Sequence, residues 1–161
     1  MAETAAVQVG IAAAVYRNTA SYGTPTWVEI TLARNSSLSR KWKYADASIR
    51  ATKAELQAKT QIQITGQIEC RADPADAGYQ ALFDAANSDS ASAPDLMILD
   101  GDITTEGVKG IRAHLNLDED QDHNIDGVVY GVFGFNTAWH SAGYPSKVEI
   151  GAGPAPVYTA F

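Results

Sequence analysis

Apolar and polar residues alternate along much of the first half of the chain, which predicts β-strands. Successive side chains of a strand point to opposite faces, so an apolar residue at every second position gives one buried face. Val7, Val9 and Ile11 follow this rule in a segment that we expect to be a strand over residues 5–16. The same pattern predicts strands over residues 27–32, 36–44 and 60–71.

The segment between the last two of these strands has no clean period, although patterned segments flank it on both sides. We therefore expect a long hairpin loop at about residues 44–60. Loops of this length without secondary structure of their own are uncommon, and they often carry function.

A helix is predicted at about residues 74–87, where the period of the apolar residues changes. Asp73 is placed to cap it, Pro74 suits the first helical position, and Asp76 stands where the acid of a capping box belongs. Its apolar residues recur at helical spacing and form one stripe, which we expect to pack on a sheet. They are Tyr79, Leu82, Phe83 and Ala86.

The second half of the chain predicts further strands over residues 95–99, 108–117 and 127–139. The last of these has mixed faces and three glycines, which indicates close approach of another backbone. Residues 143–161 contain one short strand at best, over 147–150, and indicate an arm that needs something to lie on.

Together these elements predict a mainly β fold, a sandwich or barrel of two packed antiparallel sheets with one flanking α-helix. We expect one β-sandwich domain over residues 1–139 and a C-terminal extension or arm over residues 140–161.

Composition narrows the classes of function. The formal net charge is −7 and the pI is about 4.8, which argues against a grip on nucleic acid but not against nucleic acid sliding past. The single cysteine, Cys70, lies in an alternating apolar run and is expected to be buried and inert. We expect folding in the cytosol, no signal peptide and no membrane span.

An acidic run over residues 118–126 is the most evident candidate for metal binding. Asp118, Asp120 and Asp122 match the first, third and fifth positions of a helix–loop–helix calcium site. The match then fails, because the sixth position holds His123 instead of glycine and the twelfth holds Val129 instead of glutamate. The alternative is a solvated acidic hairpin tip.

Catalytic chemistry has little support. Asp100 and Asp102 could bind a cation or act as acid and base, but Asp-Gly after a strand is also an ordinary turn signal. The three histidines lie apart in sequence, and we find no nucleophile motif and no phosphate-binding glycine-rich loop. We expect no enzymatic activity and no cofactor.

Basic residues concentrate in the first half of the chain and acidic residues mostly follow later. Trp42 and Tyr44 interleave with the basic ones, as in a platform for stacking bases. The asymmetry also suits head-to-tail self-association, in which a basic face meets an acidic one. The basic residues are Arg34, Arg40, Lys41, Lys43, Arg50, Lys53 and Lys59.

At this point the chain resembles a known family, the major tail or tail tube proteins of bacteriophages. The resemblance covers about residues 7–138 and is carried by the order and spacing of short motifs. They are Val-Gly at 9–10, Tyr-Arg-Asn-Thr at 16–19, Thr-Pro-Thr-Trp at 24–27, Asp-Pro-Ala-Asp-Ala-Gly at 73–78, Leu-Asp-Gly-Asp-Ile at 99–103 and Gly-Ile-Arg-Ala at 110–113.

The resemblance implies two packed sheets with a flanking helix, as in the type VI secretion tube, and hexameric rings that stack into a hollow tube. It implies a virion protein assembled in the cytoplasm of a bacterial host. Its partners would be itself, other tail proteins and DNA that passes an acidic lumen without specific binding, with no membrane. The long hairpin would contact the adjacent ring, through candidates Tyr44, Asp46, Ile49, Arg50, Lys53 and Leu56.

Two features depart from the family pattern, namely the acidic run and the extension after about residue 139. They concern the exact ring contacts and not the class. Three alternatives also stay open. The chain could be a monomeric calcium- or carbohydrate-binding module, a hydrolase that uses Asp100 and Asp102, or another virion part such as a decoration or tail-completion protein.

Overall fold

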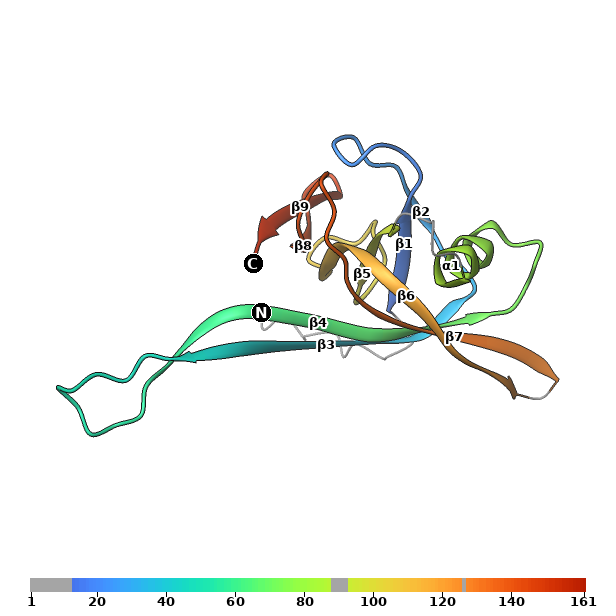
Figure 1. Ribbon diagram of the computed structural model, residues 1–161. Helices are drawn as coiled ribbons and strands as arrows, with labels where there is room; N and C mark the ends of the chain where they lie inside the picture. The colour runs from blue at the N-terminus through green and yellow to red at the C-terminus, as the bar shows by residue number, and fades with distance from the viewer. Residues whose placement is uncertain (1–12, 88–92, 126) are drawn as a thin grey trace, which may run out of the picture.

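The computed structural model describes residues 13–87, 93–125 and 127–161, with Asn35 and residues 119–125 described by backbone only. Nine strands of this part form one continuous antiparallel sheet that curls on itself (Figure 1). The strands are β1 (Ala14–Asn18), β2 (Trp27–Glu29), β3 (Ala33–Asp46), β4 (Gln57–Arg71), β5 (Asp95–Leu99), β6 (Lys109–Ile125), β7 (Val128–Thr137), β8 (Ser146–Gly151) and β9 (Ala155–Ala160).

Strand β6 belongs to both halves of this sheet. Its first residues pair with β5 on one edge and with β8 on the other, giving a six-stranded part in the order β2-β1-β5-β6-β8-β9. From Leu115 onward it pairs with β7, giving a four-stranded part in the order β6-β7-β4-β3. The prediction of a mainly β fold with two packed antiparallel layers and one helix is confirmed.

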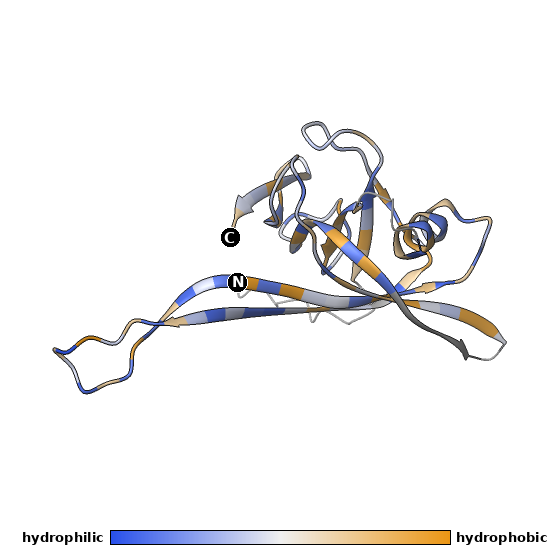
Figure 2. Ribbon diagram, in the orientation of Figure 1, coloured by the Kyte–Doolittle hydropathy of each residue, from blue (hydrophilic) through white to orange (hydrophobic). Residues whose placement is uncertain are grey.

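The main core lies between the two parts of the sheet. Phe133, Ile68 and Leu115 are 0% exposed there, and Cys70 is buried beside them, as predicted. Burial, followed by the charge of Asp76, raises the pKa of the Cys70 thiol to about 12. Figure 2 shows hydrophobic residues alternating with more hydrophilic ones along the strands. A second apolar cluster, which includes Met97 and Ile150, packs on the other face of the six-stranded part.

Helix α1 (Ala77–Asn87) covers β6 and begins three residues later than predicted. The prediction that Asp73 caps the helix was wrong. Asp76 is the cap, since its Oδ2 accepts a hydrogen bond of 2.9 Å from the Tyr79 N–H. Asp73 instead closes the preceding turn, where its Oδ1 accepts from the Ala75 N–H at 3.0 Å. The apolar stripe does pack on the sheet, with Leu82 only 1% exposed.

The N-terminal strand prediction, residues 5–16, lies largely outside the described residues, and β1 covers only its end. The strand expected over 27–32 stops at Glu29, after which Ile30 turns into the core. The strands expected over 36–44, 60–71, 95–99 and 127–139 are all present.

The C-terminal residues lie along the body of their own chain. Strand β8 pairs with residues 109–112 of β6, and β9 pairs with β8 over its whole length. Val148 and Ile150 are 3% and 1% exposed, so β8 contributes to the second apolar cluster. The expected short strand is confirmed, whereas β9 was not predicted. The predicted domain boundary after residue 139 stays a prediction.

Candidate functional site

The β3–β4 hairpin projects from the body of the described chain (Figure 1). Residues 43–61 are all exposed. The side chains of Tyr44, Ile49 and Leu56 are 55%, 59% and 38% exposed, although apolar side chains of this size are mostly buried in folded proteins. Exposed apolar groups on a projecting element are typical of a contact surface.

The loop of this hairpin is shorter than predicted. Strands β3 and β4 stay paired as far as Asp46 and Gln57, which leaves residues 47–56 as the loop. Of the six predicted contact residues, Tyr44 and Asp46 therefore lie in β3, and Ile49, Arg50, Lys53 and Leu56 lie in the loop. Their role in contacts between copies stays a prediction.

Local hydrogen bonds shape the loop. The Ser48 N–H donates to Asp46 Oδ1 at 2.9 Å, and the Leu56 N–H donates to Ser48 Oγ at 3.1 Å. Hydrogen bonds from the Ser48 side chain and backbone lower the pKa of Asp46. At the base of the projection, the Lys59 Nζ lies 5.3 Å from the centre of the Trp42 ring.

The hairpin is positively charged while the remainder of the chain is negative. Residues 40–60 hold six Lys and Arg against two Asp and Glu, a net charge of +4. The other residues hold six Lys and Arg against 17 Asp and Glu, a net charge of −11, and the two sum to the −7 of the chain. This separation was predicted, and the fold places the basic set on the projecting element.

The six-stranded part contains a buried charged centre that the sequence pattern did not predict. The Arg112 side chain is buried, its Nη2 lies 2.7 Å from Asp95 Oδ2, and it also donates to the Tyr22 carbonyl at 2.9 Å. Burial alone would lower the pKa of Arg112, but the hydrogen bonds and charge of Asp95 outweigh this and the pKa is raised.

Three aromatic rings surround the Arg112 guanidinium. Its carbon lies 3.8 Å from the ring centre of Tyr22, 4.8 Å from Tyr158 and 5.1 Å from Trp27. The Trp27 Nε1–H also donates to the Tyr158 hydroxyl at 3.0 Å. Tyr22 comes from the loop before β2, Trp27 from β2 itself, Arg112 from β6 and Tyr158 from β9, so the centre holds distant segments of the chain together.

Two histidines extend this centre. The rings of His114 and His140 stack with centroids 3.8 Å apart, and Tyr22 stacks on His114 at 5.5 Å. The His140 Nδ1 accepts a hydrogen bond from the Ala142 N–H at 3.0 Å. The pKa of His114 is lowered, first by burial, with His140 and Arg112 adding to this and Asp95 opposing it. The three histidines lie apart in sequence, so nothing in their spacing indicated His140 as the neighbour of His114.

Asp100 and Asp102 serve the turn between β5 and β6, as the turn interpretation expects. Asp100 Oδ1 accepts from the Lys109 N–H at 2.9 Å, and Asp102 Oδ1 accepts from the Thr104 N–H at 2.7 Å. These bonds hold both carboxylates to the backbone. Hydrogen bonds from Thr104 lower the pKa of Asp102.

The acidic run lies at the end of the β6–β7 hairpin, as the hairpin alternative expects, but most of it is strand and not turn. Asp118, Asp120 and Asp122 all belong to β6, which pairs with β7 up to Ile125 and Val128. This backbone is extended and does not wrap around a central ion as a calcium loop does. No group of three or more metal-ligating side chains forms within the described residues, which exclude the side chains of 119–126. The calcium assignment itself stays a prediction.

The outward face of the four-stranded part carries mostly neutral polar side chains. Register places Gln67 opposite Ser37, Thr65 opposite Ser39 and Asn136 opposite both Thr65 and Asn116. The Asn116 Nδ2 donates to Asn136 Oδ1 at 2.9 Å. Lys41 and Lys43 lie further along the same face, on the hairpin.

Among the helices of the described chain, none is long and apolar enough to cross a membrane.

Comparison with known proteins places the fold but not the family. No protein-family model matches the chain, and no curated protein matches it in sequence. One similar solved structure is the tail of an empty GTA particle, computed with helical refinement and C6 symmetry. Its TM-score is 0.59 at 12% identity, over 96% of this chain and 100% of that chain.

Another is the baseplate of the anti-feeding prophage (AFP), 6-fold symmetrised, with a TM-score of 0.59 at 14% identity. That match covers 86% of this chain and 95% of the other. This chain therefore has the fold of subunits found in those two particles.

Proposed function

We propose that the chain is a structural subunit of a phage-like tail, which assembles with copies of itself into rings that stack into a tube. The rings are hexameric, and the tube is a conduit through which DNA passes. The likeness in fold to a GTA tail with C6 symmetry and to a 6-fold baseplate supports this proposal. No catalytic step forms part of it.

The observation that carries the proposal is the β3–β4 hairpin. It exposes apolar residues on a positively charged projection, while the rest of the chain is acidic. Within the described residues of one copy, this projection extends away from the body (Figure 1). In a stack of rings it would reach the adjacent ring, where the apolar side chains become buried and the charges meet an acidic surface.

The conduit role is supported by the polar face of the four-stranded part. Amide and hydroxyl side chains do not hold phosphate as Lys and Arg do, so a polyanion can slide past them. An acidic lumen was expected from the sequence. If this face lines the lumen, its lining is mostly neutral and polar, with carboxylates such as Asp118 at one end and Lys41 and Lys43 at the other, on the hairpin.

Negative-stain electron microscopy of the purified chain at rising concentration tests the proposal. We expect hollow tubes or six-fold rings. A variant in which residues 47–56 are replaced by Asn-Gly should still form rings, because β3 and β4 pair without the loop. Its rings should not stack, because the loop that would contact the adjacent ring is gone. Circular dichroism would show that this variant folds. Particles of monomer size at every concentration would contradict the proposal.

The baseplate likeness favours a second candidate within the same class, a tail part other than the tube, such as a tail-completion protein. That role predicts single rings which do not stack at any concentration. A monomeric calcium- or carbohydrate-binding module would show neither assembly, and calcium would raise its melting temperature.

A further inference from the structure

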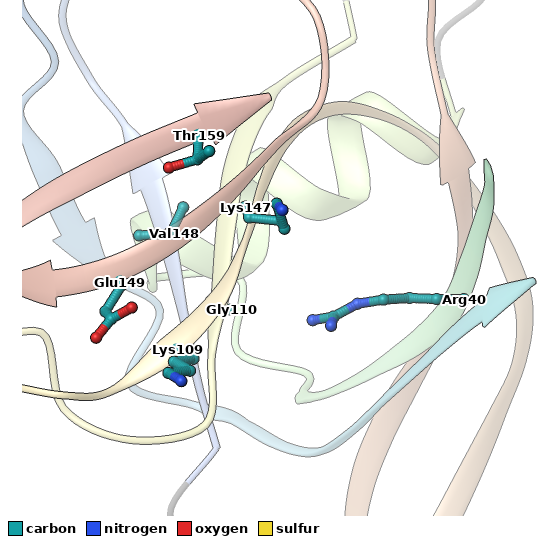
Figure 3. Close-up of a pocket in the computed structure, with 7 residues that line it drawn as sticks. All are labelled: Arg40, Lys109, Gly110, Lys147, Val148, Glu149 and Thr159. Atoms are coloured by element: carbon teal, nitrogen blue, oxygen red, sulfur yellow. The ribbon is translucent and has the colours of Figure 1, made fainter. Parts of the chain in front are cut away.

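A charged cleft opens between the two parts of the sheet, where the apolar core ends (Figure 3). Its volume is about 250 Å³, and it is lined by Arg40 of β3, Lys109 of β6, Lys147 and Glu149 of β8, and Thr159 of β9. A neighbouring cavity of about 390 Å³ shares Arg40, Lys109 and Gly110 with it and continues toward Leu38 and Ile98.

Strand register explains why these charges face one another. Arg40 pairs with Ile64, and Lys147 pairs with Ile111. Residues directly opposite each other on antiparallel strands share a face, and both isoleucines belong to the main core. The cations therefore stand on the inner faces of the two parts of the sheet, beyond the point where apolar side chains fill the space between them.

The cleft holds more cations than anions. In the described part of the chain, the side chains of Arg40, Lys109 and Lys147 make no ion pair. Glu149, which register places opposite Lys109, is the one acidic residue among the lining residues, and Asp100 lines the neighbouring cavity. Three cations on facing strands repel one another, and an anion placed between them would relieve that repulsion. The geometry therefore suits an oxyanion, with the Thr159 hydroxyl as a further donor.

We propose that this cleft binds carboxylates, and that its occupant is the acidic end of β6 in a second copy of the chain. This inference rests on the proposed function, under which copies lie against one another. Residues 118–126 hold five Asp and Glu, and residues 113–146 contain no Lys or Arg at all. The segment is thus the densest negative charge that the chain can offer to the cleft.

Placement also fits a second copy and excludes the same one. The β6–β7 ribbon continues beyond the last β4 pair, Arg71 with Tyr130, and so extends past the sheet (Figure 1). Arg40 lies opposite Ile64, about ten strand residues from the β6–β7 turn, which is roughly 33 Å at 3.3 Å per residue. Asp118, at the near end of the acidic segment, lies on the outward face of the sheet, whereas the cleft opens on the inner face. The acidic segment and the cleft of one copy therefore do not meet, and pairing would be head-to-tail.

Carboxylate fits the cleft better than nucleic-acid phosphate does. The net charge of −7 repels a polyanion, and Glu149 stands among the lining residues. A carboxylate from a second copy meets the same overall repulsion. However, it would approach on the narrow, two-stranded β6–β7 ribbon, and the apolar side chains beside it can be buried on contact.

The assignment is tested with a labelled synthetic peptide that has the sequence of residues 116–130. Its binding to the full chain is measured by fluorescence anisotropy. We expect saturable binding that weakens as salt is added. A control peptide with Asn and Gln in place of Asp and Glu should not bind. The triple variant R40Q/K109Q/K147Q should lose at least about tenfold in affinity, because three exposed charge contacts are removed.

The matched control variant is R17Q/R34Q/R71Q, which changes the net charge equally but leaves both the cleft and the β3–β4 hairpin intact. None of these three arginines lines the cleft or the neighbouring cavity. The control should keep its affinity within about twofold. Equal losses in both variants would show a general effect of net charge and would overturn the assignment, as would peptide binding that neither variant weakens.

Two further arms separate the possible sources of the anion and the two proposals. A short DNA duplex that binds wild type but not the cleft variant, while the peptide fails to bind, would assign the cleft to phosphate and overturn the carboxylate. A charge swap that combines R40E/K109E/K147E with D118K/D120K/D122K should restore assembly that either set alone prevents. Peptide binding without any assembly would refute the proposed function and leave the cleft assignment standing.

Discussion

Replacing Arg112 by methionine should destabilise the fold more than any other single loss of charge in the described chain. The substitution keeps much of the side-chain volume but removes the cation from Asp95, whose side chain is 8% exposed. Removing one partner of a buried ion pair costs about 3–5 kcal/mol, because the remaining charge is left without compensation. Asn18 still donates one hydrogen bond of 3.0 Å to Asp95, which places the expected cost nearer the lower limit.

Urea unfolding measures this cost. With a slope of about 2 kcal/mol per molar urea, a loss of about 3 kcal/mol lowers the midpoint by about 1.5 M. The measurement is made at a protein concentration where the chain does not assemble, since assembly would add its own stability. Tryptophan fluorescence reports directly, because Trp27 lies 5.1 Å from the guanidinium carbon.

The Arg34–Glu69 pair supplies the control. Its N–O distance is 2.6 Å, as short as that of the buried pair, but the Arg34 side chain is 38% exposed. Solvent screening reduces such a pair to about 1 kcal/mol or less, so Arg34→Met should move the midpoint by less than about 0.5 M. If Arg112→Met cost no more than Arg34→Met, the argument that burial makes the Arg112 centre important would be refuted.

Three other predictions concern separate parts of the molecule. Folding lowers the pKa of His114, so its contribution to stability should be fully present above the unfolded-state pKa near 6.5 and should be lost as the pH falls below that pKa. Urea midpoints between pH 7.5 and 5.5 would show this loss, and His114→Phe should make the midpoint less dependent on pH. Cys70 should resist a thiol reagent such as DTNB at pH 8 until the chain unfolds, since its pKa is about 12 and it is 0% exposed; fast labelling of native protein would contradict its burial. Gly66→Ala should destabilise the fold by about 1–3 kcal/mol, because the new Cβ would meet the Ser37 carbonyl oxygen and the Phe135 ring. Thermal melts measure this, and the control Gly23→Ala, whose Cβ would meet open space, should be near neutral.

Much of the fold could be predicted because alternation is a local signal. The apolar phase of β4, with Ile62, Ile64 and Ile68 on one face, fixes its register against the core whatever its partners are. The helix start was predicted three residues early because Asp73 and Asp76 both suit a cap. Only the hydrogen bond to the Tyr79 N–H distinguishes them.

The length of β6 could not be predicted in the same way. Acidic residues from 118 onward have weak strand propensity, and alone they favour a solvated loop. Pairing with β7, whose Val128 to Phe135 segment is strongly strand-forming, extends β6 to Ile125. The hairpin loop was overestimated for the same reason, since cross-strand pairing carries β3 and β4 through residues that lack a clean period.

The candidate sites divide along the same line. The hairpin and its charge are features of one segment, so sequence indicated them. The Arg112 centre joins residues as far apart as Trp27 and Tyr158, and the cleft joins β3 with β6, β8 and β9. Residue types alone could not bring such distant positions together.

The hydrogen bond from Trp27 to Tyr158 spans 131 positions of the chain, which constrains the order of events during synthesis. A growing polypeptide can form the β3–β4 hairpin and α1 early, but it cannot enclose Arg112 until the residues of β9 have left the ribosome. Until then β6 keeps one edge unpaired over residues 109–112, where β8 later binds. A product terminated before β8 would retain that open edge, with which another chain could pair, and an unshielded cation.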